Sequence, residues 1–438
     1  MPDNMLSNCD NRLLIVDWSS LSYHQLFALA SKNNTSEYFE LDSPEGELRA
    51  WKSKMLDKLL IMIRDLNPKD VILTLEGTNP WRSEYCKEYY EKNAKVFYDN
   101  TGYYLRFDNF LYKFSKDADG KIDFVKMDIV KDIGLIPTKE KKITELPEKI
   151  QTLFWDTVLP KYKGNRSKQT YWPFHVTKKE WKKFKEKFAI QLTGILRTHA
   201  IGLDVAEGDD VIYVAVEYWG KKYDSVVIAT CDSDMNQLLK TVTEDPEQKI
   251  RIYNHKTHEI VVCDDPKTYL ELKVLSGDDS DNINGMALPN KKTQLGKAGA
   301  AKLYESVGNC FQQAENEGWD NQYLRNKKLI DLSNIPTHIQ REICALLDAS
   351  NPEMEDISNL YQMRVDERIE KELLAMKAKG YLVLNSKERI EANPDMFKKD
   401  LVTKEKTSDK FVFKKQRTFE AIDSELDDPL SEKDLGLL

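Results

Sequence analysis

Three short apolar segments, each closed by an acidic residue, recur along the chain. They are RLLIVD at 12–17, VILTLE at 71–76 and SVVIATCD at 225–232. Segments with the apolar spacing of helices lie between and beside them, at 51–66, 180–200 and 207–219. Short runs rich in Val and Ile that alternate with helices are typical of buried parallel strands joined by crossover helices. The pattern therefore predicts a doubly wound α/β sheet within a first domain over 1–265.

The pattern changes after residue 265. Segments 266–275, 296–307 and 335–349 have helical spacing with no strand pattern between them, which predicts a smaller α-helical domain over 266–350. The remainder, 351–438, is expected to hold one more helix over 361–383 and then a charged, disordered tail. Residues 96–160 are interpreted as an insertion in the first domain, with a hairpin that turns at DADG and a role left open.

Composition excludes several classes of protein. The six cysteines are scattered without a CxxC pair, which argues against a disulfide framework or a structural zinc site. No apolar run is long enough to span a membrane and the start lacks a secretory pattern, so we expect a cytoplasmic protein with no membrane partner. The net charge is 65 − 73 = −8, but residues 161–187 hold ten Lys and Arg against two Glu. Charge is therefore sorted by region, and the basic region is a candidate for nucleic-acid contact.

Carboxylates follow the three predicted strands. The carboxyl ends of parallel strands meet at one edge of a sheet, where ligands bind. Any single acid is more often a solvated surface charge, but many carboxylates at one edge would need cations. Oxygen donors without His or Cys favour Mg²⁺ or Mn²⁺, and two such ions suit phosphodiester cleavage. The candidate ligands are Asp17, Glu76, Glu207, Asp209, Asp210, Asp232, Asp234, Asp278 and Asp281.

Basic and aromatic residues supply candidates for contact with nucleic acid. Lys163 and Arg166 in YKGNR would point the same way from a helical turn toward a phosphate, although a solvated basic face is the alternative. Tyr171 and Trp172 are expected to stack on unpaired bases, whereas nearby Trp181 and Phe184 are expected to be buried. The glycine-rich helix start of QLGKAGAAKLYE is a weaker phosphate-binding candidate through Gly296, Lys297, Gly299 and Lys302.

The order LIVD, YKGNR, AEGDD, ATCDSD and SGDDSDNI resembles the phage-type 5′→3′ nucleases, which comprise flap endonucleases and phage ribonuclease H. The resemblance covers roughly 10–345. It implies a PIN-like sheet with a helical arch and a helix–hairpin–helix element that grips duplex DNA. Glu76 departs from the usual Asp, and the hairpin has Gln294 in place of the usual first Gly and Lys297 where Pro is frequent.

The resemblance also implies roles for the candidate residues. Lys163 and Arg166 would contact the scissile phosphate as catalytic cations, and K⁺ could bind at the helix–hairpin–helix element. The first Mg²⁺, for which Mn²⁺ could substitute, would be held by Asp17, Glu76, Asp209 and Asp232, supported by Glu207 and Asp210. The second ion would be held by Asp234, Asp278 and Asp281.

The sequence therefore predicts a monomeric Mg²⁺-dependent 5′→3′ nuclease of DNA replication or repair, in the host cytoplasm if the source is a bacteriophage. Its expected substrates are 5′ ends or flaps of DNA and RNA–DNA hybrids, as in RNA-primer removal. A sliding clamp, through the ending EKDLGLL, and a single-stranded DNA-binding protein are candidate partners. The alternatives are a non-catalytic DNA-binding replication accessory with the same fold and a PIN-type ribonuclease that cuts single-stranded RNA.

Overall fold

The chain divides into two compact units in the computed structural model. The first unit comprises 1–73, 172–201 and 347–438, and the second comprises 74–171 and 202–346. The structure describes residues 11–30, 41, 43–99, 102–108, 110–116, 122–127, 139–164, 172–193, 196, 198–241, 243–245, 247, 249–288 and 293–350.

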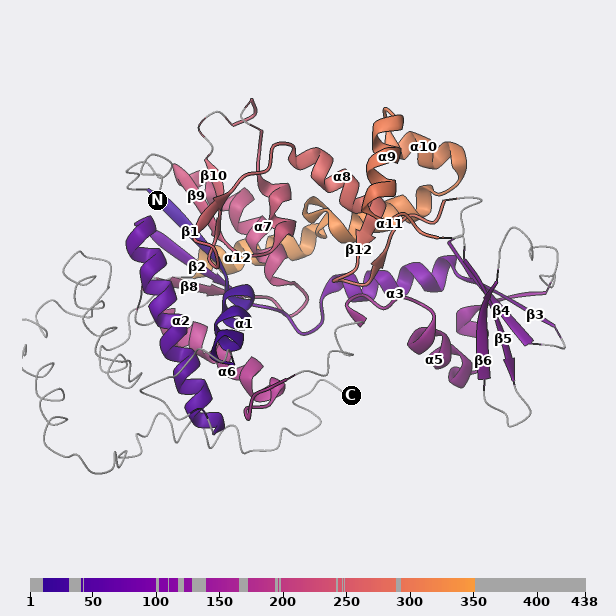
Figure 1. The fold of residues 1–438 in the computed structure, drawn as a ribbon, viewed down its shortest axis with the longest axis horizontal. Coiled ribbons are helices and arrows are strands. Elements are labelled where there is room, and N and C mark those ends of the chain that lie inside the picture. The colour runs from indigo at the N-terminus through magenta and orange to yellow at the C-terminus, as the bar shows by residue number, and fades with distance from the viewer. Residues whose placement is uncertain are drawn as a thin grey trace, which may run out of the picture. The chain divides into compact units, whose positions relative to one another are not determined.

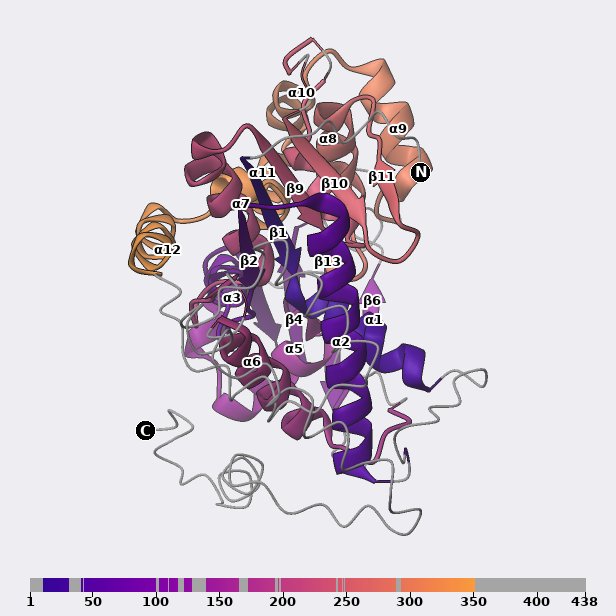
Figure 2. The same cartoon turned by 90° about the vertical axis from the view of Figure 1, so that its left-hand side faces the viewer.

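The first unit combines short buried strands with three helices. Its strands β1 (Arg12–Asp17), β2 (Asp70–Thr74) and β8 (Thr198–Ile201) lie in the order β1-β2-β8. The long helix α2 (Pro44–Leu66) packs against α1 (Trp18–Leu29) and α6 (Lys178–Thr193), as Figure 2 shows. Sequence sets the ends of α2, because Ser43 caps its first turn and Asn67 closes it with a left-handed φ of 46°.

An aromatic cluster fills the core of the first unit. Trp51 on α2 makes edge-on contacts with Trp18 of α1 and with Trp181 and Phe184 of α6, with ring centroids 5.7 to 6.5 Å apart. Edge-to-face packing is the preferred geometry of such rings. The predicted burial of Trp181 and Phe184 is confirmed.

The second unit contains the next group of strands. Strands β9 (Ser225–Ala229), β10 (Ile250–Asn254) and β11 (Glu259–Val261) lie in the order β11-β10-β9. Strands β9 and β10 pair in parallel, and helix α7 (Gly208–Tyr218) precedes them in the chain. The predicted mixed α/β class with a central parallel sheet is confirmed.

Residues 96–160 contribute most of a five-stranded antiparallel sheet. Figure 1 shows its strands beside helix α5 (Glu148–Thr157). The strands are ordered β6-β5-β4-β3-β7, with bounds Lys95–Asp99 for β3, Gly102–Phe107 for β4, Phe110–Lys116 for β5, Ile122–Met127 for β6 and Glu140–Lys142 for β7. The predicted hairpin is confirmed, because β5 and β6 pair across DADG with Lys116 opposite Ile122. The turn itself lies outside the described residues.

The segment after residue 265 is largely helical. It comprises α8 (Pro266–Ser276), α9 (Lys297–Ser306), α10 (Cys310–Glu317), α11 (Asp320–Ile330) and α12 (Thr337–Ala349). Two-residue strands β12 (Gly277–Asp278) and β13 (Ile283–Asn284) stand between α8 and α9. The three helices expected in this segment are confirmed. The helix–hairpin–helix assignment of α8, β12, β13 and α9 stays a prediction.

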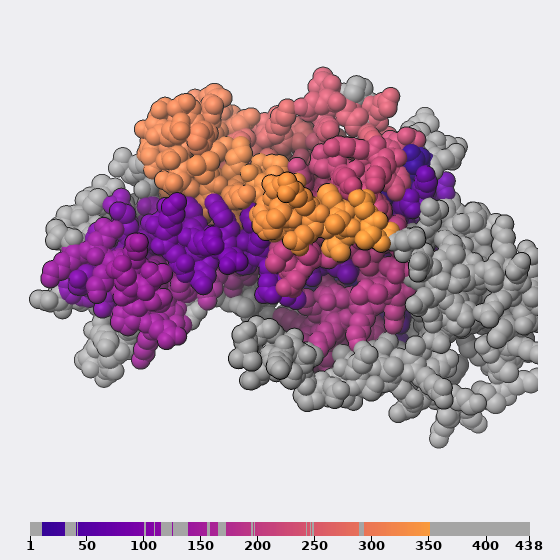
Figure 3. Space-filling view, turned by 180° about the vertical axis from the view of Figure 1, so that it is seen from behind, coloured from indigo at the N-terminus to yellow at the C-terminus, as the bar shows by residue number. Residues whose placement is uncertain are grey.

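The insertion sheet and the helical segment share one core in the second unit. Phe107 and Phe154 of the insertion belong to the same buried cluster as Ile283 and Trp319 of the helical segment. Helix α3 (Trp81–Asn93) joins them, and Figure 3 shows its purple surface directly against the orange helices. The insertion is therefore packed into the second unit and is more than an isolated hairpin.

Several expectations change with the structure. The helix predicted over 180–200 ends at Thr193, and its last part is wrong because Thr198–Ile201 forms β8. Strand β2 ends at Thr74 and β9 at Ala229, so Glu76 and Asp232 lie in the loops that follow the strands. Among the described residues, no helix combines the length and the apolar character that crossing a bilayer requires. The helix expected over 361–383, the tail and the predicted arch lie largely outside the described residues.

Candidate active site

The loop after β2 places Glu76 beside the start of α7. Gly77 donates its N–H to the carbonyl of Ala206 at 2.9 Å, and a Cβ at Gly77 would stand 2.2 Å from the carbonyl oxygen of Asp204. Only glycine permits this close approach of two backbones. The carboxylate of Glu76 accepts a 3.3 Å hydrogen bond from the N–H of Gly208, in the first turn of α7. The loop therefore brings two acidic motifs that are far apart in sequence to one place.

A buried guanidinium holds the acids of AEGDD. Arg82, in the first turn of α3, is 2% exposed. Its Nη1 lies 3.1 Å from Glu207 Oε2 and 2.7 Å from Asp210 Oδ1. Trp81 donates its indole N–H to Asp210 Oδ2 at 3.0 Å. Burial alone would lower the pKa of Arg82, but Asp210, Tyr162 and Glu207 together outweigh it and raise that pKa, so the guanidinium stays charged.

Tyr162 and Lys163 bring a second positive charge to Glu207. The Lys163 ammonium pairs with Glu207 and lies 3.8 Å from Asp281 Oδ2. The Tyr162 hydroxyl lies 2.6 Å from Glu207 Oε2 and 2.9 Å from Asp281 Oδ2. Burial would raise the pKa of Glu207, but Lys163 and Arg82 together lower it, so Glu207 is an anion held by two cations. Burial and the neighbouring Glu207 raise the pKa of Tyr162, so the phenol keeps its proton.

The backbone at Lys163 differs from the expected helical turn. Lys163 has a φ of +54°, which is the left-handed region, and its N–H donates to the carbonyl of Asp281 at 2.8 Å. Asn282 also has a positive φ, and its side chain donates to the carbonyl of Lys161 at 2.8 Å. The chain at YKG is therefore fixed against the SGDDSDNI motif, and this contact aims Lys163 at Glu207 and Asp281. Arg166 lies outside the described residues.

A second group of acids surrounds Lys273 of α8. The Lys273 ammonium pairs with Asp234, in the short 3₁₀ turn Ser233–Leu238, and lies 2.8 Å from Asp278 Oδ2 in β12. The other oxygen of Asp278 accepts hydrogen bonds from the N–H and hydroxyl of Ser280, at 2.8 and 2.6 Å. Burial would raise the pKa of Asp278, but Lys273 and Ser280 outweigh it and lower that pKa, so Asp278 is ionised.

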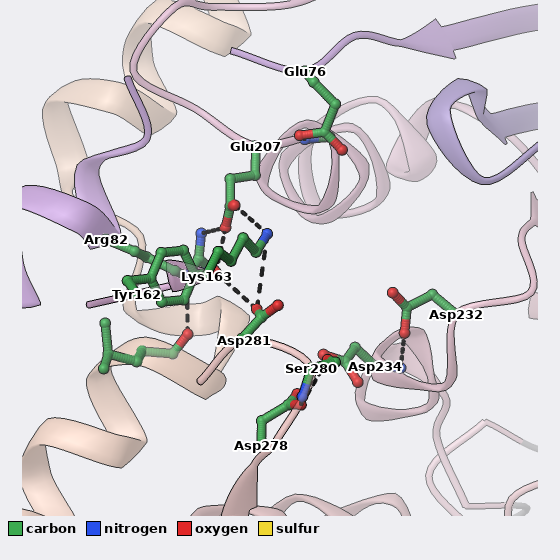
Figure 4. A network of polar contacts seen from close by, with 12 residues as sticks. Glu76, Arg82, Tyr162, Lys163, Glu207, Asp232, Asp234, Asp278, Ser280 and Asp281 are labelled. Carbon is green, nitrogen blue, oxygen red and sulfur yellow. Dashed lines mark hydrogen bonds and ion pairs between the residues drawn. The ribbon is translucent and has the colours of Figure 1, made fainter. Parts of the chain in front are cut away.

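Asp232 is joined to this second group through the backbone. Its Oδ1 accepts a 2.9 Å hydrogen bond from the N–H of Asp234, and its own N–H donates to Thr230 Oγ1 at 2.9 Å. Figure 4 shows acids of both groups in the second unit, with Asp281 facing Lys163 and Asp234 facing Asp278. Glu76 lies away from these pairs, and Glu207 is the labelled acid nearest to it. Four of the predicted acids thus form two pairs with a lysine each, Glu207 and Asp281 with Lys163, and Asp234 and Asp278 with Lys273.

Two further predicted ligands stand at helix starts. Asp17 lies in the first unit, at the last position of β1, where its Oδ1 caps α1 by accepting the N–H of Ser20 at 2.9 Å. Asp209 is half-buried in the first turn of α7, where the helix dipole favours an acid. Their roles as metal ligands stay predictions.

The predicted DNA-contacting residues are partly described. Trp172 packs edge-on against Phe27 and Phe174 and in a tilted contact against Trp181, all in the first unit, and donates its indole N–H to the carbonyl of Val176 at 2.7 Å. Stacking of a base on Trp172 stays a prediction. Tyr171 lies outside the described residues. At the start of α9, Gly296, Lys297 and Lys302 are exposed, while Gly299 is half-buried against Leu295.

Divalent ions fit the donor chemistry of the site, but the side chains do not yet surround one. The donors are carboxylate oxygens, which Mg²⁺ and Mn²⁺ prefer. Within the described residues, however, no three Asp, Glu, His or Cys side chains are grouped as a metal would need. Ion pairs give the reason, since Lys163 stands between Glu207 and Asp281 and Lys273 between Asp234 and Asp278.

The sequence did not point to two cations that pair with the acids of this site, Arg82 and Lys273. Arg82 belongs to WRSEYCKEYYEKNAK, which superficially imitates the YKGNR motif, and Lys273 is one lysine of an ordinary helix. No local signal marks Arg82, because Glu207 and Asp210 lie more than a hundred positions away in sequence. Lys273 is likewise unmarked as a paired residue, since one of its two partners, Asp234, lies in another segment.

Comparison with known proteins gives similarity in structure alone. No family model matches the chain, and no curated protein matches it significantly. Its fold is similar to a bacteriophage T5 5′-exonuclease with zinc bound, at 15% identity and a TM-score of 0.43, over 77% of this chain and 98% of that chain. It is also similar to a T5 flap endonuclease in a pseudo-enzyme–product complex with DNA and metal ions, at 15% identity and a TM-score of 0.41, over 83% and 98%. At these identities the likeness concerns the fold.

Proposed function

We propose that the chain is a divalent-ion-dependent 5′→3′ nuclease of the phage type, which cleaves phosphodiester bonds at 5′ ends or flaps of DNA. The observation that supports it best is the meeting of YKGNR, AEGDD, ATCDSD and SGDDSDNI in the second unit. Tyr162 and Lys163 contact both Glu207 and Asp281, which are 44 and more residues away in sequence. A purely structural protein gains little from so many buried charges, because each costs desolvation.

The chain's own residues support distinct tasks in this reaction. Lys163 carries a positive charge beside Glu207 and Asp281 and could contact a phosphate oxygen. Arg82 and Tyr162 hold the carboxylate of Glu207 in one orientation. Mg²⁺, or Mn²⁺ in its place, would activate water and neutralise charge on the phosphate when bound. We assign Glu76, Asp232, Asp234 and Asp278 as residues that face such ions, and retain Asp17, Asp209 and Asp281 as further candidates.

The decisive experiment removes the negative charge of one proposed ion ligand, Asp232. Asp232→Asn is expected to lower the cleavage rate of a labelled 5′-flap DNA by at least about a hundredfold, since metal-site groups are worth several kcal/mol. DNA affinity should remain. The matched control is Asp224→Asn, which changes an exposed acid just before the same strand β9 and should leave cleavage unchanged. Full activity of Asp232→Asn would overturn the proposal.

The finer substrate assignment follows from the same assay. RNA-ended and DNA-ended flaps, a nicked RNA–DNA hybrid and single-stranded RNA should be compared in Mg²⁺ and in EDTA. We propose cleavage of the 5′-ended duplex substrates, as in primer removal. Cleavage confined to single-stranded RNA would favour a PIN-type ribonuclease, and binding without cleavage would favour a replication accessory. Added K⁺, a sliding clamp and a single-stranded DNA-binding protein test the remaining proposed cofactor and partners.

A further inference from the structure

Lys273 stands where two proposed ion ligands face each other. Its ammonium contacts Asp234 from the 3₁₀ turn after β9 and Asp278 from β12. These side chains are largely buried, with relative exposures of 15% for Lys273, 21% for Asp234 and 9% for Asp278. Two carboxylates facing each other in such surroundings repel unless a cation lies between them. Lys273 is that cation in this structure.

Asp234 and Asp278 each direct one carboxylate oxygen at the Lys273 ammonium. Ser280 occupies Asp278 Oδ1 with two hydrogen bonds, so Asp278 Oδ2 is the oxygen that faces Lys273. The N–H of Asp234 is tied to Asp232, which fixes the turn that carries the Asp234 carboxylate. The Asp278 carboxylate is thus positioned by Ser280 and the backbone of Asp234 by Asp232, while Lys273 reaches both carboxylates from α8 on a long, flexible stem. The ammonium can therefore move away while Ser280 keeps the Asp278 carboxylate in place.

We propose that Lys273 is an internal stand-in for the second divalent ion. It neutralises Asp234 and Asp278 while the protein is free of ions, and it must leave before an ion can bind there. This inference rests on the proposed function and explains why no ion-binding group is present among the described side chains as they stand. It follows that the second ion binds more weakly than these acids would otherwise allow, because binding has to break two ion pairs.

The test is a Mn²⁺ titration of the full chain without DNA, with free Mn²⁺ followed by electron paramagnetic resonance. Wild type is expected to bind two ions, the second weakly. Lys273→Met removes the competing charge and should tighten the second ion by about tenfold or more, as expected for a full charge at contact distance. Lys273→Arg keeps the charge and should remain weak. The control Lys267→Met changes a 79% exposed lysine on the same helix and should titrate like wild type.

Thermal unfolding supplies a second measurement, which distinguishes the proposed role of Lys273 from that of a purely structural ion pair. In EDTA, Lys273→Met should melt below wild type, because Asp234 and Asp278 then repel each other. Saturating Mn²⁺ should recover that loss for Lys273→Met. A loss that persists equally in Mn²⁺ would show that Lys273 is only structural.

The outcomes separate the two proposals. Two ions in wild type with an unchanged or weaker second ion in Lys273→Met would overturn the role of Lys273 and leave the nuclease proposal standing. No Mn²⁺ bound by either protein would overturn the metal-dependent function itself.

Discussion

At the level of single residues, contacts between buried charged side chains position the acids of the site. Glu207 is contacted by Arg82, Lys163 and Tyr162, and Asp210 by Arg82 and Trp81. Both carboxylates are therefore occupied by protein cations or donors. The supporting role that the resemblance implies for Glu207 and Asp210 stays a prediction.

Arg82 should therefore matter for stability as well as for activity. Arg82→Met leaves Asp210 buried without its cation and should lower the free energy of unfolding by about 3 kcal/mol, as breaking one side of a buried ion pair does. Urea unfolding followed by tryptophan fluorescence measures this. Lys92→Met, at the exposed end of the same helix, is the control and should change stability by less than about 0.5 kcal/mol. A similar small effect of Arg82→Met would refute the structural role.

Lys52 makes the stability of the chain depend on pH. It is buried on α2, with its ammonium 5.5 and 5.2 Å from the ring centroids of Phe184 and Phe188. Burial, helped by the positive charge of Arg49, lowers its pKa to about 8. The unfolded chain has the ordinary value of 10.5. Between these values the unfolded chain binds the extra proton, so the unfolding free energy rises as pH increases from about 8 to 10.5.

The expected size of this effect is on the order of 3 kcal/mol. Lys52→Met removes the buried ammonium, so it should stabilise the protein near pH 7 and lose that advantage as pH approaches 10.5. Denaturant unfolding across this pH range measures the unfolding free energy of wild type and of Lys52→Met. The difference between the two proteins cancels the contribution of other lysines and of tyrosines. Lys58→Met on the same helix is the control. A difference that does not change with pH would contradict the lowered pKa of Lys52.

The acids of the site could be predicted from sequence, whereas most of their partners could not. Asp232, Asp234, Asp278 and Asp281 stand in short motifs whose order is specific. The acids that hold Arg82 lie more than a hundred positions away, so no local pattern marks it. Lys273 pairs with Asp278 five positions on, but also with Asp234, which is 39 positions away, so a local pattern shows only half of its contact. Direct ion binding by Glu76 stays a prediction, since its carboxylate accepts a hydrogen bond from the N–H of Gly208.

At the scale of elements, local patterns located the core strands and long helices but missed the insertion sheet. Strand β1 and helices α7, α8 and α12 follow the expected segments closely. The insertion strands mix Tyr, Lys and Phe without clean alternation, because parts of both faces are buried. Strand β8 was lost within a predicted helix, since four residues are too few to show a period of two.

A buried ion pair ties the insertion sheet to helix α11. Arg325 pairs with Asp108, at the turn between β4 and β5, and also donates to the Tyr90 hydroxyl at 3.1 Å. Tyr89 donates its hydroxyl to Asp108 at 3.0 Å. Both charged side chains are almost fully buried, with exposures of 1% and 2%. We infer that the sheet and the helices of the second unit unfold together.

Asp108→Asn tests this coupling. Asn tolerates the left-handed φ of 48° at this position, so the change removes charge with little backbone strain. It leaves Arg325 buried and unpaired and should cost about 3 kcal/mol. Hydrogen exchange should then speed up in β4, β5 and α11 alike. Asp99→Asn, an exposed acid of the same sheet, is the control. Faster exchange confined to the sheet would show that the insertion unfolds on its own.

For the whole molecule, the distribution of charge matters more than its sum. A net charge of −8 opposes a polyanion, so binding of DNA must use local basic surfaces and should weaken steeply with salt. Lys297 and Lys302 are exposed on α9, where the glycine-rich helix start predicts phosphate contact. If both touch phosphates, each should contribute about one unit to the slope of log affinity against log salt.

This expectation can be measured without cleavage in the Asp232→Asn background. Lys297→Met combined with Lys302→Met should weaken flap-DNA binding and reduce the salt slope by about two, because fewer counterions are released on binding. Lys221→Met changes an exposed lysine beside the end of α7 and should leave the slope as it is. An unchanged slope in the double variant would mean that α9 does not contact the DNA backbone, and the basic region over 161–187 would then be the surface to test.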